Sequence, residues 1–244
     1  ARATPDGSTL LITLHDGMVI GKAARWQMGY DPLADLTPIA EVGVSDVYWT
    51  VRGNAPWRTI AELIAHARAN PGKVNFGSGG YGSSLHLAME LLNVAAGITL
   101  THVPFRGGAQ AIPELLAGRI DAMLATPALG LSYFQAGTMR PLALVGTARS
   151  PLYPDIPTIA ESGHPDVSIS LGVGVFGPRG LPRPLVEQIN ADVGRVIGAP
   201  ELKSRFTAEG FVVSERSAAS YATFLAKEVA RVEPLVKRID FKQG

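Results

Sequence analysis

Residues 73–84, Lys-Val-Asn-Phe-Gly-Ser-Gly-Gly-Tyr-Gly-Ser-Ser, indicate the fold class of this chain most directly. The first four, Lys73–Phe76, form a short run typical of a β-strand. After the loop, Leu87 and Leu91 recur at helical spacing, and Gly97 marks the end of that helix. Four glycines and three serines therefore lie between the end of a strand and the start of a helix.

The composition of this loop suits an anionic ligand. Glycines let the backbone approach a ligand closely, serines offer hydroxyls, and a helix start presents unpaired N–H groups with partial positive charge. A carboxylate or phosphate is expected there, and the predicted contacts are Ser78, Gly79, Gly80, Ser83 and Ser84. The alternative is a plain Gly-rich turn in which Ser83 or Ser84 caps the helix. The residue spacings of a P-loop and of a dinucleotide fingerprint are both absent.

Two further strands follow, each ending in small, polar or aromatic residues. They are predicted at Ile98–Val103 and Arg119–Ala125, with a helical stretch between them. Strands that alternate with helices indicate a parallel sheet, and ligands bind at the carboxyl ends of its strands. These ends add four candidate ligand contacts, Phe105, Arg106, Thr126 and Pro127. The Arg106 guanidinium could pair with a carboxylate through two hydrogen bonds, or it could simply be solvated.

A fourth polar strand end lies near the start of the chain. The strand predicted at Thr9–Thr13 runs into Leu14, His15, Asp16 and Gly17. The Asp16 carboxylate would repel an anion, but it could bind the amine of an amino-acid ligand. Capping of a turn is the other interpretation.

Composition excludes several classes of function. The chain has 244 residues, 46% of them apolar and 18% charged, which is typical of a globular protein and suits one large or two small domains. Its net charge of +1 provides no basic face for nucleic acid. The lack of cysteine excludes disulfides and thiolate catalysis. No apolar run is long enough for membrane insertion, and no signal peptide is visible in this chain.

An ordered series of motifs resembles one known family over nearly the whole chain. The motifs include Pro5-Asp6-Gly7, Tyr30-Asp31-Pro32, Asn70-Pro71-Gly72-Lys73, Phe76-Gly77-Ser78-Gly79, His102-Val103-Pro104-Phe105-Arg106-Gly107-Gly108 and Asp155-Ile156-Pro157-Thr158. Together they resemble the substrate-binding proteins of tripartite tricarboxylate transporters, the Bug family. The ordered set is far more specific than any one of its motifs.

The resemblance implies a periplasmic solute receptor with a two-lobed α/β fold of the type II periplasmic-binding class and a ligand cleft between the lobes. The implied ligand is a small carboxylate: a dicarboxylate, a tricarboxylate, an acidic amino acid or an aromatic acid. The implied partners are the membrane components of the transporter, and neither a metal nor a cofactor is implied. Long apolar runs near 39–51 and 167–176 match the crossings between lobes. The predicted lobes are therefore residues 1–46 with 172–244, and residues 47–171.

The sequence departs from the family pattern at its start. Family members begin with a strand, a Pro/Gly-rich loop that clamps the ligand, a helix and a second strand. None of these precedes Ala1 in this sequence. The chain is expected to be a fragment or processed form, or to lack half of the clamp. The first lobe is then expected to have an exposed sheet edge or gap.

Two rival functions remain open. One is a serine hydrolase that uses Ser78 or Ser83 as nucleophile and His86 or His102 as base. The nucleophile elbow Gly-x-Ser-x-Gly is absent, and no Asp or Glu is obviously placed to orient either histidine, so the chain is expected not to be an enzyme. The other rival is a receptor fold without a ligand clamp that acts as an interaction or sensing partner.

Overall fold

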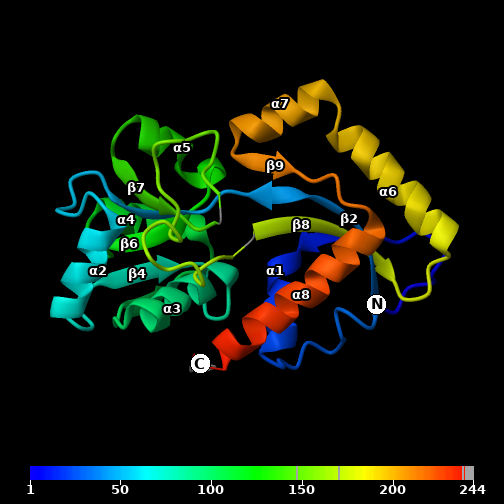
Figure 1. Ribbon diagram of the computed structural model, residues 1–244, viewed down its shortest axis with the longest axis horizontal. Coiled ribbons are helices and arrows are strands. Elements are labelled where there is room, and N and C mark those ends of the chain that lie inside the picture. Colours follow the sequence, from blue (N-terminus) through cyan, green and yellow to red (C-terminus); the bar gives the residue numbers. More distant parts are fainter. Residues whose placement is uncertain (147, 170, 238, 240–244) are drawn as a thin grey trace. The chain divides into compact units, whose positions relative to one another are not determined.

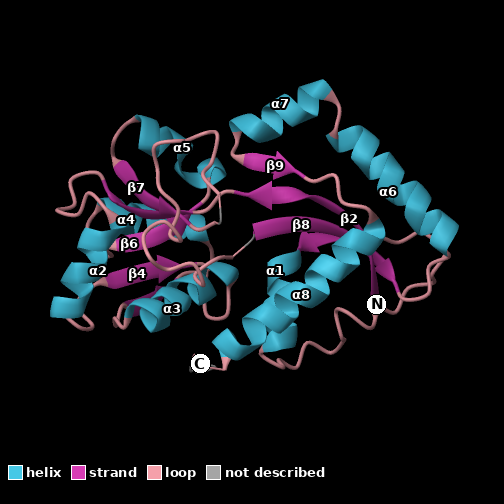
Figure 2. Ribbon diagram, in the orientation of Figure 1, coloured by secondary structure: helices cyan, strands magenta, loops and turns pink. Residues whose placement is uncertain are grey.

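The computed structural model describes residues 1–146, 148–169, 171–237 and 239, and the chain divides into two compact units (Figure 1). Unit 1 comprises Ala1–Ser45 and Leu171–Lys237, and the main segment of unit 2 is Asp46–Ser170. The chain therefore leaves unit 1, builds a second unit and returns. Each unit has its own sheet and its own helices; Figure 2 shows helices in cyan and strands in magenta.

Unit 1 contains a four-stranded antiparallel sheet. Its strands are β1 (Leu11–Leu14), β2 (Leu36–Ser45), β8 (Leu171–Pro178) and β9 (Phe211–Val213), and their order across the sheet is β1-β8-β2-β9. Apolar side chains of β2 and β8, among them Ile39 and Val175, form a core with Leu181 and Val186.

The helices of unit 1 are α1 (His15–Ala23), α6 (Arg183–Ile197), α7 (Pro200–Ala208) and α8 (Ala218–Val236). Helices α6 and α8 both contact β2, and α1 contacts α8 (Figure 1). The sequence predicts helices near 184–197, 201–209 and 217–239, and α6, α7 and α8 lie within a few residues of these bounds. It does not indicate α1, because Asp16, Gly17 and Gly21 are poor helix formers. Helix α1 is held by burial of Met18, Val19 and Ile20.

Strand β1 lies at an edge of the unit 1 sheet, since it pairs with β8 on one side only. Its apolar side chains are partly in solvent: Leu11 is 40% exposed, Ile12 67% and Leu14 50%. This is the exposed edge that was expected in the first lobe.

Unit 2 contains a five-stranded sheet with the order β5-β4-β6-β3-β7. The strands are β3 (Tyr48–Arg52), β4 (Asn75–Ser78), β5 (Thr101–Pro104), β6 (Ala122–Ala125) and β7 (Met139–Leu144). Strand β4 is parallel to both β5 and β6, while β3 is antiparallel to β6 and β7. The parallel arrangement of the three predicted strands is confirmed, although each begins two or three residues later than predicted.

The helices of unit 2 alternate with its strands. They are α2 (Ile60–Ala69), α3 (Ser84–Ala96), α4 (Gly108–Leu116) and α5 (Pro127–Gln135). Thr59 caps α2 by accepting the Glu62 N–H at 3.2 Å. The residues Thr158 and Glu161 make the same type of reciprocal cap, but a turn and no helix follows, because Gly163 adopts a left-handed φ of 94°.

Candidate functional site

Three helices of unit 2 begin at one edge of its sheet. Strands β5, β4 and β6 are neighbours and parallel, so their carboxyl ends lie along the same edge. Each strand is followed by a loop and a helix: β4 by α3, β5 by α4 and β6 by α5. The positive ends of three helix dipoles therefore lie at this edge.

Glycines bring the loops after β4 and β5 into contact. A Cβ on Gly79 would lie 3.6 Å from both the Gly107 Cα and the Gly108 N. Gly80 has a φ of 116° and Gly82 a φ of 73°, conformations that side chains disfavour. Larger residues at these positions would strain the loop.

Several N–H groups at this edge have no acceptor. Within the described residues, the backbone N–H groups of Gly79, Ser84 and Gly108 make no hydrogen bond. No side chain caps α4 at Gly107 or α5 at Thr126. Unpaired donors at helix starts are suited to bind the oxygens of an anion.

The two serines at the start of α3 differ in role. Ser83 caps the helix: its hydroxyl accepts the His86 N–H at 3.2 Å and donates to the Gly80 carbonyl at 2.9 Å. Ser84 is buried. The capping interpretation of Ser83 is thus confirmed, and this cap fixes the path of the loop against α3.

Ser78, at the end of β4, is buried and hydrogen-bonded. Its Oγ accepts the Gly80 N–H at 3.1 Å, donates to the Gly80 carbonyl at 3.2 Å and lies 2.6 Å from the His102 Nε2. Burial and the neighbouring His86 lower the pKa of His102 to about 4, so this imidazole is neutral at neutral pH. With its proton on Nε2, His102 donates to Ser78.

His102 stacks on a second histidine, His86, from the first turn of α3. The ring centroids are 4.0 Å apart at an angle of 19°. His86 Nδ1 accepts the Gly82 N–H at 3.1 Å, and its Nε2 lies 3.6 Å from the Glu90 carboxylate. The expectation that no acidic residue is placed to orient a histidine is therefore wrong. The i,i+4 spacing of His86 and Glu90 on one helix was the sequence signal for this pair.

The remaining predicted contacts of unit 2 lie at the same edge but differ in exposure. Phe105 is half-buried and packs against the core that includes Ala111 and Ile120. Arg106 is exposed, and no carboxylate of the described chain forms an ion pair with it. Thr126 and Pro127 are the cap and first residue of α5. Gly107 and Gly108, whose backbone lies against Gly79, were not among the predicted contacts.

Asp16 belongs to unit 1, whereas the other nine predicted contacts belong to unit 2. It occupies the first turn of α1 and is 4% exposed. The proposed turn cap is wrong: the cap residue of α1 is Leu14, and neither Asp16 carboxylate oxygen has a hydrogen-bond partner among the described residues. Burial raises the pKa of this carboxyl to about 7.

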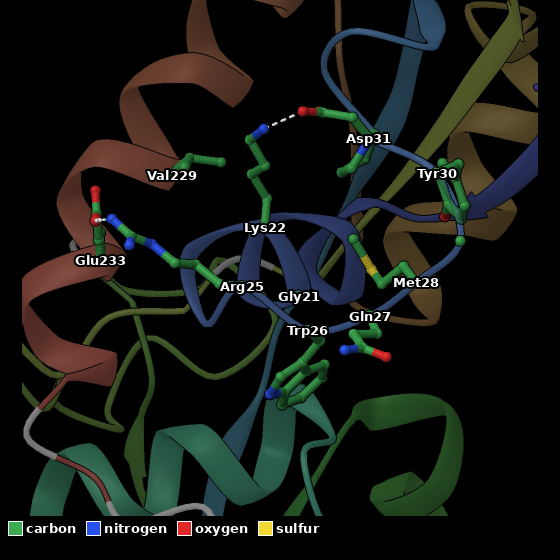
Figure 3. A pocket seen from close by; sticks show the side chains of 12 residues that line it. Gly21, Lys22, Arg25, Trp26, Gln27, Met28, Tyr30, Asp31, Val229 and Glu233 are labelled. Atoms are coloured by element: carbon green, nitrogen blue, oxygen red, sulfur yellow. Dashed lines mark hydrogen bonds and ion pairs between the residues drawn. The ribbon is translucent and has the colours of Figure 1, made fainter.

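Unit 1 also contains an open pocket of about 770 Å³ between the end of α1, the segment 24–32 and α8 (Figure 3). Its charged side chains are already paired. Lys22 bonds Asp31, and Arg25 lies 3.4 Å from Glu233. None of the predicted ligand contacts lines it.

Metal binding and membrane crossing find no support in the part of the chain that the structure describes. No group of three or more His, Cys, Asp or Glu side chains there could hold a metal ion. None of the helices described combines the length and apolar character that a membrane crossing requires.

Comparison with known proteins identifies the class and then the family. Two solved structures share the α/β periplasmic-binding fold over almost the whole chain. MatC from Rhodopseudomonas palustris, solved with malate, is 28% identical with a TM-score of 0.85, covering 96% of this chain and 81% of its own. A second R. palustris protein, solved with adipate, is 28% identical with a TM-score of 0.86, covering 97% of this chain and 79% of its own. The predicted fold class is thus confirmed.

The family follows from sequence. The model for the tripartite tricarboxylate transporter family receptor matches residues 1–241. A UPF0065 protein encoded between tcbD and tcbE in Pseudomonas sp. strain P51 is 33% identical over 97% of this chain and 70% of the relative. This chain belongs to the tripartite tricarboxylate transporter receptor family, as the ordered motifs indicated. It is a solute-binding protein by fold and by family.

Proposed function

We propose that this protein is a periplasmic receptor that captures a small carboxylate at the loop Ser78–Ser84 for a tripartite tricarboxylate transporter. The observation that carries the proposal is the set of unpaired N–H groups of Gly79, Ser84 and Gly108 at one sheet edge. A carboxylate offers two acceptor oxygens, and each charge-assisted bond contributes roughly 1.5–3 kcal/mol.

The ligand class follows from two considerations. Three helix starts favour negative charge, and the guanidinium of Arg106 adds a cation near the same edge. The two structural relatives named above hold malate and adipate, which are both dicarboxylates. A dicarboxylate is therefore the first class to test, followed by tricarboxylates, acidic amino acids and aromatic acids.

The test is titration calorimetry with malate and adipate on the purified chain and two loop variants. Gly80→Val is expected to weaken binding severely, because φ is 116° and a Cβ would lie 3.3 Å from the Phe105 carbonyl oxygen. Ser78→Ala is expected to weaken it about tenfold, because the Gly80 N–H and His102 lose their common partner.

Matched controls separate loss of the site from loss of the fold. Gly137→Val introduces the same side chain at another left-handed glycine of unit 2, with no atom within 4 Å of the new Cβ. Ser132→Ala removes an exposed hydroxyl from α5. Both controls are expected to bind as the parent does. If the loop variants also bind like the parent, the recognition site lies elsewhere.

A hydrolase is the second candidate, because Ser78 Oγ lies 2.6 Å from the His102 Nε2. Two features oppose it. The Ser78 hydroxyl is buried, and Glu90 contacts His86 instead of His102. We expect no turnover of a generic ester; turnover that Ser78→Ala abolishes would establish this candidate.

The receptor fold without a working ligand clamp is the remaining alternative. It predicts no heat with any acid of the panel and no small acid retained in native mass spectrometry of the purified protein. The proposal predicts saturable binding of at least one of these acids.

A further inference from the structure

Two histidines, His86 and His102, make hydrogen bonds to the loop Ser78–Ser84. His86 comes from the first turn of α3, and His102 comes from β5, where it pairs with Phe76 across the parallel ladder. Their rings form one stack: Phe76 on His102 with centroids 4.8 Å apart, and His102 on His86 with centroids 4.0 Å apart. The exposed Tyr81 ring meets the edge of this stack, 4.7 Å from His102.

Each imidazole bonds a different part of the loop. His102 Nε2 bonds the Ser78 Oγ at 2.6 Å, and that hydroxyl holds both the N–H and the carbonyl of Gly80. His86 Nδ1 accepts the Gly82 N–H at 3.1 Å. The two glycines held in this way have left-handed φ angles, a conformation that glycine leaves at little cost. Outside bonds are therefore needed to hold the loop in one conformation.

We propose that His86 and His102 are positioning residues, which hold the Ser78–Ser84 loop so that its free N–H groups point at a bound carboxylate. This inference rests on the proposed function for the identity of the ligand. The holding bonds themselves are properties of the unliganded chain, so they can be tested without a ligand.

The inference also makes the loop sensitive to acid. The bond from His86 needs an unprotonated Nδ1, because that nitrogen accepts the Gly82 N–H. His102 would still donate from Nε2 after taking up a proton on Nδ1, but its positive charge would then lie in a partly buried place against the His86 ring. The groups that face the pair are Glu90 from α3, Tyr81 and Ser78 from the loop, and the uncharged Phe76 from β4. Of these, the carboxylate of Glu90 raises the pKa of His102, whereas burial and the His86 ring lower it more strongly.

Four variants separate hydrogen bonding from ring packing. His86→Phe and His102→Phe keep an aromatic ring in the stack and remove the bond to the loop. His86→Asn keeps an acceptor for the Gly82 N–H, and His102→Gln keeps a donor for Ser78, each without a titrating group. His66→Phe is the control, because His66 is an exposed histidine of the same unit that packs on Trp57.

The first readout is amide hydrogen exchange of Gly80 and Gly82 in the ligand-free chain. We expect exchange at Gly82 to rise about tenfold in His86→Phe, because this variant removes the acceptor of the Gly82 N–H. Exchange at Gly80 is expected to rise about tenfold in His102→Phe, because this variant removes the bond that orients Ser78, the acceptor of the Gly80 N–H. The Asn and Gln variants are expected to restore most of the protection. Parent-like protection in both Phe variants would overturn the inference. Should a Phe variant not fold, unprotected loop amides in the folded Asn and Gln variants would overturn it equally.

The second readout is the pH dependence of the Gly80 amide resonance. In the parent it is expected to shift as His102 takes up a proton near pH 4, and in His102→Gln this shift is expected to vanish. An unchanged shift in His102→Gln would contradict the role of His102. Malate titration is a separate measurement: if the parent binds no acid while the exchange results hold, the proposed function fails and the positioning of the loop stands.

Discussion

The buried polar residues of unit 1 show how single glycines shape a charged cluster. His15 Nδ1 lies 3.0 Å from the Tyr221 hydroxyl and 4.0 Å from the Glu41 carboxylate. A Cβ on Gly172 would lie 1.9 Å from the His15 ring, and a Cβ on Gly174 would lie 2.0 Å from the Tyr221 hydroxyl. Glycine at these two positions of β8 is therefore what lets the cluster fit against the sheet.

Asp16 gives a prediction at the residue scale. Its pKa is about 7 in the folded chain because of burial, against about 3.9 when unfolded. The folded state thus binds the proton more tightly than the unfolded state does. The stabilisation that this proton provides is complete below about pH 3.9 and is lost as pH rises through 7. At pH 8 the folded parent must ionise a buried carboxyl, and Asp16→Asn removes the cost of that ionisation. We expect this variant to raise the free energy of unfolding at pH 8 by up to about 4 kcal/mol.

Urea unfolding of parent and Asp16→Asn at two pH values checks this. The difference in free energy of unfolding between the two proteins is expected to shrink toward zero near pH 4, because the Asp16 carboxyl of the folded parent is already neutral there. A difference that is equal at both pH values would mean that Asp16 is not the group responsible. Asp31→Asn is the control, because the Lys22 ammonium lowers the pKa of that partly exposed carboxyl.

At the element scale, the sequence predicts the three parallel strands and the loop after each, because alternation of strands and helices is a local pattern. It predicts the position of the Ser78–Ser84 loop for the same reason. The contact between Ser78 and His102 could not be predicted, because the residues are 24 apart and meet only through the register of β4 on β5. Helix α1 was missed because tertiary burial, and not helix propensity, holds it.

The exposed edge strand β1 gives a second prediction. Its unpaired backbone groups and exposed apolar side chains form a template for pairing with another chain. We expect Ile12→Lys to reduce concentration-dependent self-association of this chain in sedimentation velocity. Val196→Lys is the control, because Val196 is 57% exposed but lies on α6. Equal self-association in all three proteins would show that β1 is not a pairing surface.

At the scale of the whole molecule, the chain is a two-unit α/β protein of a solute-receptor family. Nine of the ten predicted ligand contacts lie in unit 2, between the last residue of a parallel strand and the first residue of the helix that follows it. Unit 2 therefore carries the features on which the proposed carboxylate site depends. The ligand itself could not be predicted from sequence, because donor geometry fixes the charge of a ligand more closely than its length or substituents.

We propose that a small carboxylate binds the N–H groups of Gly79, Ser84 and Gly108, which have no acceptor among the described residues. The most direct test is a titration of the ¹⁵N-labelled chain with malate, followed through its amide resonances. We expect saturable shifts concentrated at Gly79, Ser84 and Gly108, and none at comparable exposed glycines such as Gly137. Saturable shifts confined to other residues, or no shifts with malate, adipate or the other acids of the panel, would contradict the claim.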